Sequence, residues 1–539
     1  MSFGKQGKSM AKKFPLRALI LGAILSVVVA AYSAYAGLKV GGVYWPIVTT
    51  SLISLSILKF LGRTDKNEVN IMQTAGSSGG LLAAGVVFTI PAAIMLGFRI
   101  SYLEILLTSL VGGILGVVFS YPLRKQLIER EKLPCQDGVA AAALISAGDR
   151  GGKAAKILLY SFGIGAIFSF ARDFLKIFPS YFNLESLKIE GLAKSFSFGS
   201  SLSLIPFAGG FLIGPRFTTA WFLGAIVTYF GIIPYAIFSS AFSSKFSVVS
   251  EIARPLGVGI VLGAGIIFFI MKGLPVFSKM IDDWKNAKAR KMAGIALIVC
   301  IGVIALITNM DLPLAFIAII GAFAVSYLAG RSTAEMNVDP MEIFAMLVML
   351  AAKMLGFSAL PLILLAAIVT IAAGIAGDMM QDLKAGYLLK TDLSHQLIAQ
   401  IVGMASAALA IGGILLALQS SGGFGTIDFP APQAVAIKEL ASAGGLSNML
   451  VFGLLIGAAL SMLLLLKRKE LGMAPIAFGI GMYVPIELSF PLFIGGMVRH
   501  YFEKKKTVEK ARLVAGAVIA GEGIVGVSLT LLGLATAIG

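Results

Sequence analysis

The chain contains few of the residues that most often bind metal ions or form cross-links. Its 539 residues include two cysteines, Cys135 and Cys300, and two histidines, His395 and His500. The cysteines lie on separate segments without the close spacing of a zinc or redox motif, so we expect neither a disulfide framework nor a thiolate metal site. Two histidines alone do not complete a structural zinc cluster. We therefore expect no resident metal ion and no cofactor.

A complete nucleotide-binding loop is also missing. The segment 148–154, GDRGGKA, is similar to a phosphate-binding loop, but its spacing is one residue short. Ala154 stands where that loop needs a hydroxyl group. If the chain moves a solute, we expect that ATP hydrolysis within this chain does not power the movement.

Charged residues are scarce and apolar residues are abundant. Charged side chains make up 13% of the chain and hydrophobic ones 58%, whereas soluble domains contain about a quarter charged residues. Apolar runs such as 103–121, 360–376 and 449–466 are long enough to cross a hydrocarbon core of about 30 Å as helices. The sequence predicts an all-α, polytopic helical membrane protein. The net charge of +17 fits the basic cytoplasmic loops of such proteins, so we infer no nucleic-acid partner.

The apolar segments correspond to about fourteen to sixteen membrane-spanning helices, depending on how segments interrupted by Pro or Gly are counted. The first span has the layout of a secretory signal, and we interpret it as an uncleaved anchor. Basic residues before and within it predict a cytoplasmic N-terminus: Lys5, Lys8, Lys12, Lys13 and Arg17. We expect the protein in the inner (plasma) membrane. The basic segments 285–291, 467–470 and 499–506 cannot all be cytoplasmic if every segment crosses once, so we expect broken or re-entrant helices.

Several short motifs occur twice in the same order. The Gln-Asp pair at 136–137 recurs at 381–382, and the proline-interrupted segment 206–230 is similar to 475–502. Transporters are often built from two related halves. We interpret the pattern as a duplication with two pseudo-symmetric halves, whose relative orientation stays open. The halves are an N-terminal transmembrane repeat, 1–284, and a C-terminal one, 285–539.

Six motifs, in order and across nearly the whole chain, resemble the oligopeptide transporter family. They are AYAGLKVGGVYWP (34–46), NIMQTAGSSGGLLAAGVVFTIPA (70–92), GPR (214–216), GDMMQDLKAGYLL (377–389), VPIELSFPLFIGG (484–496) and AGEGIVGVSL (520–529). One branch of that family moves short peptides with protons, and the yellow stripe-like branch moves metal chelates of amino-acid-derived ligands. The motifs identify the family without separating its branches. In length the chain resembles the compact prokaryotic members.

Helix breaks inside apolar segments are candidate substrate sites. Gly214 and Pro215 interrupt one long segment, and Pro485 interrupts the similar segment later in the chain. Such breaks persist in a membrane where protein or a watery cavity satisfies the freed backbone groups. Arg216, beside the first break, is a candidate partner for a substrate carboxylate or, alternatively, an anchor at the cytoplasmic edge. Glu487, after the second break, is a candidate substrate contact.

Glu522 is our first candidate for coupling transport to an ion. It lies among small apolar residues, with no lysine or arginine in the nine residues before it. A carboxyl group in apolar surroundings can gain and lose a proton as a cavity opens to either side of the membrane. We therefore interpret Glu522 as a proton or cation site.

The stretch GDMMQDLKAGYLLKTD (377–392) crowds polar residues directly after an uncharged run. We predict that these residues begin a short helix, where the helix dipole favours acids, and that Asp378, Gln381 and Asp382 share one face. Asp378 is then a second coupling candidate, Gln381 and Asp382 contact substrate, and Lys384 lines the cavity. The alternative is a cytoplasmic helix cap and a solvated turn. The matching polar residues of the first half are Gln136 and Asp137 for gating, and Asn70, Gln73, Ser77 and Ser78 for substrate binding.

Together these features predict a secondary active transporter of short oligopeptides, driven by the proton gradient, with alternating access to a midplane site. The alternative is a transporter of metal chelates. An intramembrane aspartyl protease is disfavoured because the segment 375–378, IAGD, breaks the Gly-x-Gly-Asp signature. A channel would line a continuous pore with polar rings, which fits two halves with broken helices less well. The expected partners are the peptide or chelate, protons or another coupling cation, and the lipid bilayer; self-association fits such a carrier, without a defined subunit number.

Overall fold

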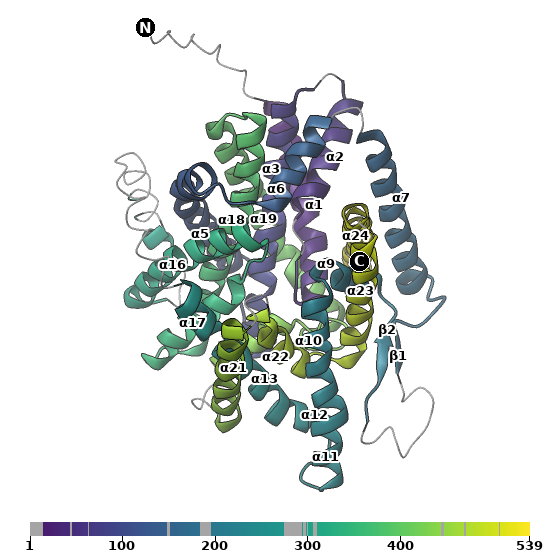
Figure 1. The fold of residues 1–539 in the computed structure, drawn as a ribbon, viewed down its shortest axis with the longest axis vertical. Coiled ribbons are helices and arrows are strands. Elements are labelled where there is room, and N and C mark those ends of the chain that lie inside the picture. Colours follow the sequence, from purple (N-terminus) through teal and green to yellow (C-terminus); the bar gives the residue numbers. More distant parts are fainter. Residues whose placement is uncertain are drawn as a thin grey trace.

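The chain folds almost entirely into helices (Figure 1). The computed structural model describes residues 15–43, 46–62, 64–147, 151–183, 196–273, 294, 298, 300–304, 310–442, 447–467, 471–505 and 507–538. Within these residues, eleven helices are long and apolar enough to cross a membrane, and three further apolar helices are shorter. The prediction of an all-α polytopic membrane protein is confirmed.

The helices and strands follow one another in this order. The first group is α1 (Leu16–Val40), α2 (Ile47–Phe60), α3 (Lys66–Val87), α4 (Ile90–Met95), α5 (Tyr102–Leu123), α6 (Gln136–Ala147) and α7 (Gly151–Ser169). Two short antiparallel strands, β1 (Tyr181–Asn183) and β2 (Gly199–Ser201), come next. They are followed by α9 (Leu204–Ile213), α10 (Pro215–Ile226), α11 (Ile233–Phe238), α12 (Lys245–Val248) and α13 (Arg254–Phe268).

The later part of the described chain contains the longest helices. These are α16 (Leu312–Met336), α17 (Met341–Met354), α18 (Ala359–Leu389), α19 (Leu393–Gly422), α20 (Pro432–Ala441), α21 (Asn448–Lys467), α22 (Ala474–Tyr483), α23 (Ile486–Lys504) and α24 (Val508–Ile538). Five π-helical segments extend helices or join them: Arg124–Arg130, Phe170–Phe174, Val227–Ile232, Val249–Ala253 and Phe269–Gly273. The predicted boundary between repeats at 284 and 285, most of the span predicted near 292–308, and the lysines before residue 15 lie outside the described residues.

Helices α3 and α18 form the centre of the bundle. They pack on each other, α18 also packs on α5 and α16, and α3 also packs on α1 and α19 (Figure 1). Both are surrounded by protein, since 89% and 83% of the residues in their most apolar windows are buried. The polar residues that they carry are therefore shielded from lipid and water, and each needs a partner inside the protein.

The polar stretch 377–392 does not begin a new helix, which corrects the prediction of a short helix there. Helix α18 continues unbroken through it to Leu389. The alternative of a solvated turn is wrong for Asp378, Gln381 and Asp382, which are at most 1% exposed, and holds for the end of the stretch, where the exposed Asp392 caps α19. No proline interrupts the stretch, and side chains from other helices pair with its polar groups, so the helical backbone continues.

Two apolar segments are each broken where the sequence predicts it. Helix α9 ends before Gly214, whose φ of 99° favours glycine because a Cβ would be strained there. Pro215 then begins α10 in the first turn, where the N–H that proline lacks would have no helical partner. Helices α22 and α23 are separated by Val484 and Pro485.

The two broken helices pack on each other reciprocally. Helix α9 lies against α23, and α10 lies against α22. The backbones approach so closely that a Cβ on Gly210 would lie 1.8 Å from Leu492 O, and a Cβ on Gly481 would lie 1.8 Å from Trp221 O. Trp221 Nε1 also donates a hydrogen bond to Ser489 Oγ at 3.1 Å. This packing holds the four half-helices together beside the cavity described next.

Candidate functional site

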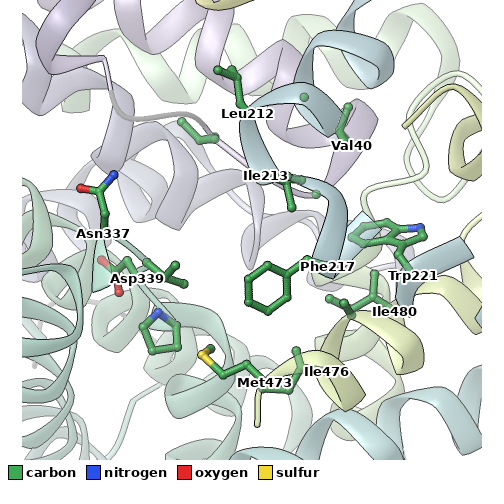
Figure 2. Close-up of a pocket in the computed structure, with 18 of the residues that line it drawn as sticks. Val40, Leu212, Ile213, Phe217, Trp221, Asn337, Asp339, Met473, Ile476 and Ile480 are labelled. Carbon is green, nitrogen blue, oxygen red and sulfur yellow. The ribbon is translucent and has the colours of Figure 1, made fainter. Parts of the chain in front are cut away.

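A cavity of about 690 Å³ lies beside the first helix break. Its volume falls within the range of about 300–1,000 Å³ that is typical of small-molecule sites. Figure 2 shows Phe217 pointing into its middle, with Trp221 and Ile480 on one side and Asn337 and Asp339 on the other. Four residues that the sequence predicts for the site do line it: Gln136, Gly214, Pro215 and Arg216.

The cavity wall carries basic and acidic groups on different elements. Arg216 comes from α10, Arg499 from α23 and Arg512 from α24. Asp339 follows α16, and Glu342 lies in the first turn of α17. The cavity therefore offers groups for both an anion and a cation of one ligand.

Arg499 stabilises the broken helix as well as lining the cavity. Its Nη1 donates to Leu212 O at 2.6 Å, at the C-terminal end of α9, and its Nε pairs with Glu503 Oε1 at 2.8 Å. A cation at a helix C-terminus interacts favourably with the helix dipole. A Cβ on Gly214 would lie 3.0 Å from Arg499 Nη1, so the glycine also makes room for this contact.

Asp339 and Glu342 lie between the membrane-spanning helices α16 and α18. Both carboxylate oxygens of Asp339 are buried and have no hydrogen-bond partner within the described part of the chain. Burial raises the pKa of Asp339 well above its ordinary value, and the neighbouring Glu342 and then Asp378 raise this pKa further. Burial also raises the pKa of Glu342 to about 7. Near neutral pH this acid pair can bind either a proton or a cationic ligand group.

Gln381 connects the cavity wall to the centre of the bundle. Its Nε2 donates to Asn337 Oδ1 at 2.8 Å and to Thr333 O at 3.1 Å, and its Oε1 accepts from Gly138 N at 2.9 Å. Asn337 Nδ2 in turn donates to Asp137 Oδ2 at 3.1 Å. Gln381 and Asp137, one from each copy of the repeated Gln-Asp pair, therefore meet through Asn337.

A second group of polar residues is buried between α3, α18 and α19. Gln73 Nε2 donates to Asp382 Oδ1 at 2.5 Å, and Ser77 Oγ donates to Asp382 Oδ2 at 2.8 Å. Ser77 Oγ and Gln400 Nε2 each lie 3.3 Å from Asp378 Oδ2. The structure thus brings together four predicted residues and adds Gln400. None of the five lines the cavity. Gln381 is not part of this group, because its side chain contacts α6 and α16.

Glu522 lies in an ion-pair cluster. Arg172 Nη1 is 2.8 Å from Glu522 Oε1, and Arg172 Nη2 is 2.7 Å from Asp173 Oδ2. Ser203 Oγ and Leu204 N also donate to the Glu522 carboxylate, at 2.5 and 2.8 Å. The expectation that Glu522 has only apolar surroundings is therefore wrong, because its cation comes from a helix distant in sequence. Its predicted role in coupling stays a prediction.

The remaining predicted residues lie outside the groups described above. Asn70 Nδ2 donates to Thr391 Oγ1 at 3.2 Å, Ser78 Oγ donates to Ala75 O of its own helix at 2.8 Å, and Lys384 Nζ donates to Leu133 O at 2.9 Å. Glu487 lies beside Gly199 of β2, outside the cavity lining. Pro485 lines a second cavity of about 230 Å³ instead.

Several residues of these sites were not predicted from the sequence. The rule that charges inside apolar segments are paired or functional would have identified Arg172, which lies in such a segment. Asp339, Glu342, Arg499 and Arg512 lie near helix ends, where charges are common, so no local signal distinguishes them. Their importance follows only from facing one cavity.

The sequence is similar to one protein family and to two named proteins. It matches the family model described as OPT oligopeptide transporter protein over residues 14–294 and 286–532. A protein of Haemophilus influenzae named "Putative oligopeptide transporter" is 26% identical, over 92% of this chain and 92% of its own length. A Saccharomyces cerevisiae protein with the same words in its name is 30% identical over 26% of this chain and 22% of its own length. The family match extends over nearly the whole chain.

Proposed function

The chain belongs to the OPT oligopeptide transporter family, and from this premise we propose that it carries short oligopeptides by alternating access, driven by the proton gradient. Its role in membrane transport follows from the family and from the apolar helices. The peptide substrate, the driving ion and the use of the 690 Å³ cavity as the substrate site are our proposal.

The presence of both acidic and basic side chains in the cavity wall is the observation that supports a peptide most directly. A peptide carries an ammonium group at one end and a carboxylate at the other. In this proposal Asp339 and Glu342, which line the cavity, pair with the ammonium group. Arg216 lies in the first turn of α10, where a guanidinium fork and the positive end of the helix dipole both favour a carboxylate. Phe217 and the other apolar lining residues then contact varied side chains without selecting one.

Proton coupling is supported by the acid pair in the same cavity. A carboxyl group whose pKa is near 7, as that of Glu342 is, binds a proton on the more acidic side of a membrane and releases it on the other. A substrate ammonium group competes for the same carboxylate, so binding of the peptide and of the proton would be linked. The coupling roles predicted for Asp378 and Glu522 remain predictions beside this pair.

Uptake into proteoliposomes tests the proposal. A labelled mixture of tripeptides to pentapeptides is offered under an imposed proton gradient, beside an iron chelate of an amino-acid-derived ligand. We expect peptide accumulation that stops when the gradient is collapsed. Arg216→Gln should raise the KM for peptides with a free carboxylate and leave that for C-terminally amidated peptides nearly unchanged. Lys467→Gln, at an exposed position at the end of α21, is the matched control.

The outcomes separate the alternatives. Accumulation of the chelate without the peptides would assign the chain to the yellow stripe-like branch. Peptide flux that only equilibrates and ignores the proton gradient would overturn proton coupling. An equal loss for free and amidated peptides in Arg216→Gln would show that Arg216 does not bind the carboxylate.

A further inference from the structure

The polar group between α3, α18 and α19 contains more hydrogen-bond acceptors than donors. It consists of the carboxylates of Asp378 and Asp382, the hydroxyl of Ser77 and the amides of Gln73 and Gln400. These five side chains are at most 1% exposed. The carboxylates of Asp378 and Asp382 are one helical turn apart, so they lie on the same face of α18 in a dry interior.

Among the residues that the structure describes, no lysine, arginine or histidine pairs with these carboxylates. Within the described residues, the groups that act on Asp378 and Asp382 are Gln73, Ser77, Gln400 and the two acids themselves. Lys384, the nearest base on α18, donates its hydrogen bond to Leu133 O. Two ionised carboxylates without a counterion are strongly disfavoured in a protein interior, so the group needs a bound cation or protons.

Unpartnered oxygen atoms indicate more than protonation. Asp378 Oδ1, Gln73 Oε1 and Gln400 Oε1 are all buried and lack a hydrogen-bond partner among the described residues. Each amide turns its Nε2 toward a carboxylate, so protons on the carboxyl groups would leave both amide oxygens without a partner unless the amides rotated. A hard cation takes several oxygen ligands at once, and glutamine can turn its oxygen toward it by rotating the amide.

We propose that Gln73, Ser77, Asp378, Asp382 and Gln400 form a binding site for a dehydrated monovalent cation of the size of sodium. Helices α3, α18 and α19 supply carboxylate, amide and hydroxyl oxygens from three directions, which is the ligand chemistry of a hard cation. A monovalent ion loses its water at lower cost than magnesium does. Magnesium usually retains several waters, so a site made of buried side chains favours the monovalent ion. One carboxylate balances the ion and the other keeps a proton.

The site is placed to influence the substrate cavity. Asp378 is close enough to act electrostatically on Asp339 of the cavity wall. Gln381, on the same helix, holds Asn337, which lines the cavity two residues before Asp339. A cation beside Asp378 would favour the ionised form of Asp339, which is the form that pairs with an ammonium group. This consequence rests on the proposed function, whereas the binding of the cation does not.

Cation binding is measured on the purified full-length protein in lipid nanodiscs, without any transport assay. Sodium chloride replaces choline chloride at constant ionic strength, and the thermal unfolding midpoint and the binding of radioactive sodium are both recorded. We expect a saturable rise in Tm and saturable sodium binding. Asp378→Asn and Gln400→Met should both lose these responses, while Glu129→Gln, a partly exposed carboxylate on the segment after α5, should keep them.

The results distinguish the cation site from the transport proposal. If the wild-type protein shows no saturable response to sodium, the proposed site is wrong, whatever the uptake assay shows. This test does not depend on whether a variant folds. Stabilisation by calcium but not by sodium would overturn the monovalent assignment. A sodium response that survives in both variants would show that the ion binds elsewhere. A sodium response lost in the variants, in a protein that moves no peptide, would support the site and count only against the proposed function.

Discussion

The buried ion pair between Arg172 and Glu522 allows a quantitative test of the structure. The two side chains are 1% and 0% exposed and join α7 and its π-helical extension to α24. Removing one member leaves the other charge in the interior without its partner. We therefore predict that each single substitution, Glu522→Gln and Arg172→Met, lowers the free energy of unfolding by much more than a surface substitution does.

The expected magnitudes follow from what each variant leaves behind. Loss of one partner from a buried ion pair costs about 3–5 kcal/mol. Glu522→Gln should lie near the lower value of about 3 kcal/mol, because Arg172 keeps Asp173 at 2.7 Å. Arg172→Met should lie near the upper value of about 5 kcal/mol, because both Glu522 and Asp173 lose their cation. The double variant Arg172→Met/Glu522→Gln should fall short of the sum by about 2 kcal/mol, since the charge that each single substitution leaves without its partner is also removed.

The measurement is the unfolding of the four proteins in mixed micelles under increasing denaturant, with proton-driven uptake recorded for each folded variant. Arg124→Met is the matched control, because its ion pair with Glu129 is partly exposed and should contribute less than about 1 kcal/mol. The uptake values then show separately whether Glu522 has a part in coupling.

If Glu522→Gln is as stable as the wild-type protein, the reasoning is refuted, because Glu522 is then uncharged in the folded protein. Strict additivity of the two substitutions in the double variant would equally show that the side chains do not interact. A stable Glu522→Gln protein that has lost only proton-driven accumulation would instead support the coupling role predicted from the sequence.

Three further predictions concern the cavity and its supports. Because burial raises the pKa of Glu342 from its ordinary value of 4.5 to about 7, the folded protein holds a proton there that the unfolded chain has lost. The Tm should therefore fall as the pH rises from about 4.5 to about 7. If Glu342→Gln shows the same fall of Tm with pH, Glu342 is not its source. Gly214→Ala should lower stability by about 1–3 kcal/mol, since an alanine is strained at a φ of 99° with an extended ψ, and an unchanged Tm would contradict the conformation of this break. Gln381→Leu should lower stability by about 3 kcal/mol, because each buried group left without a partner costs about 1–3 kcal/mol. The control is Gln126→Leu, at a partly buried glutamine in the π-helical segment after α5; if Gln381→Leu is as stable as this control, the link from Gln381 to Asn337 is wrong.

The sequence alone determined the class of the protein and its helix breaks. Long apolar runs leave no alternative to membrane-spanning helices when the backbone must satisfy its own hydrogen bonds in lipid. Gly214 and Pro215 act on their own φ angles and on the N–H that proline lacks, so the break between α9 and α10 depends on local chemistry. The motifs that identify the family are likewise continuous stretches of sequence.

Only the tertiary structure decided which polar residues meet. The short helix predicted at 377–392 is in fact part of α18, because Gln73, Ser77 and Gln400 on other helices pair with its polar side chains. Glu522 finds a cation in Arg172, 350 residues earlier in the chain. In a dry interior every charge or amide must find a partner, but the partner is set by which helices pack together, and the apolar surfaces that direct this packing are nearly alike in every span.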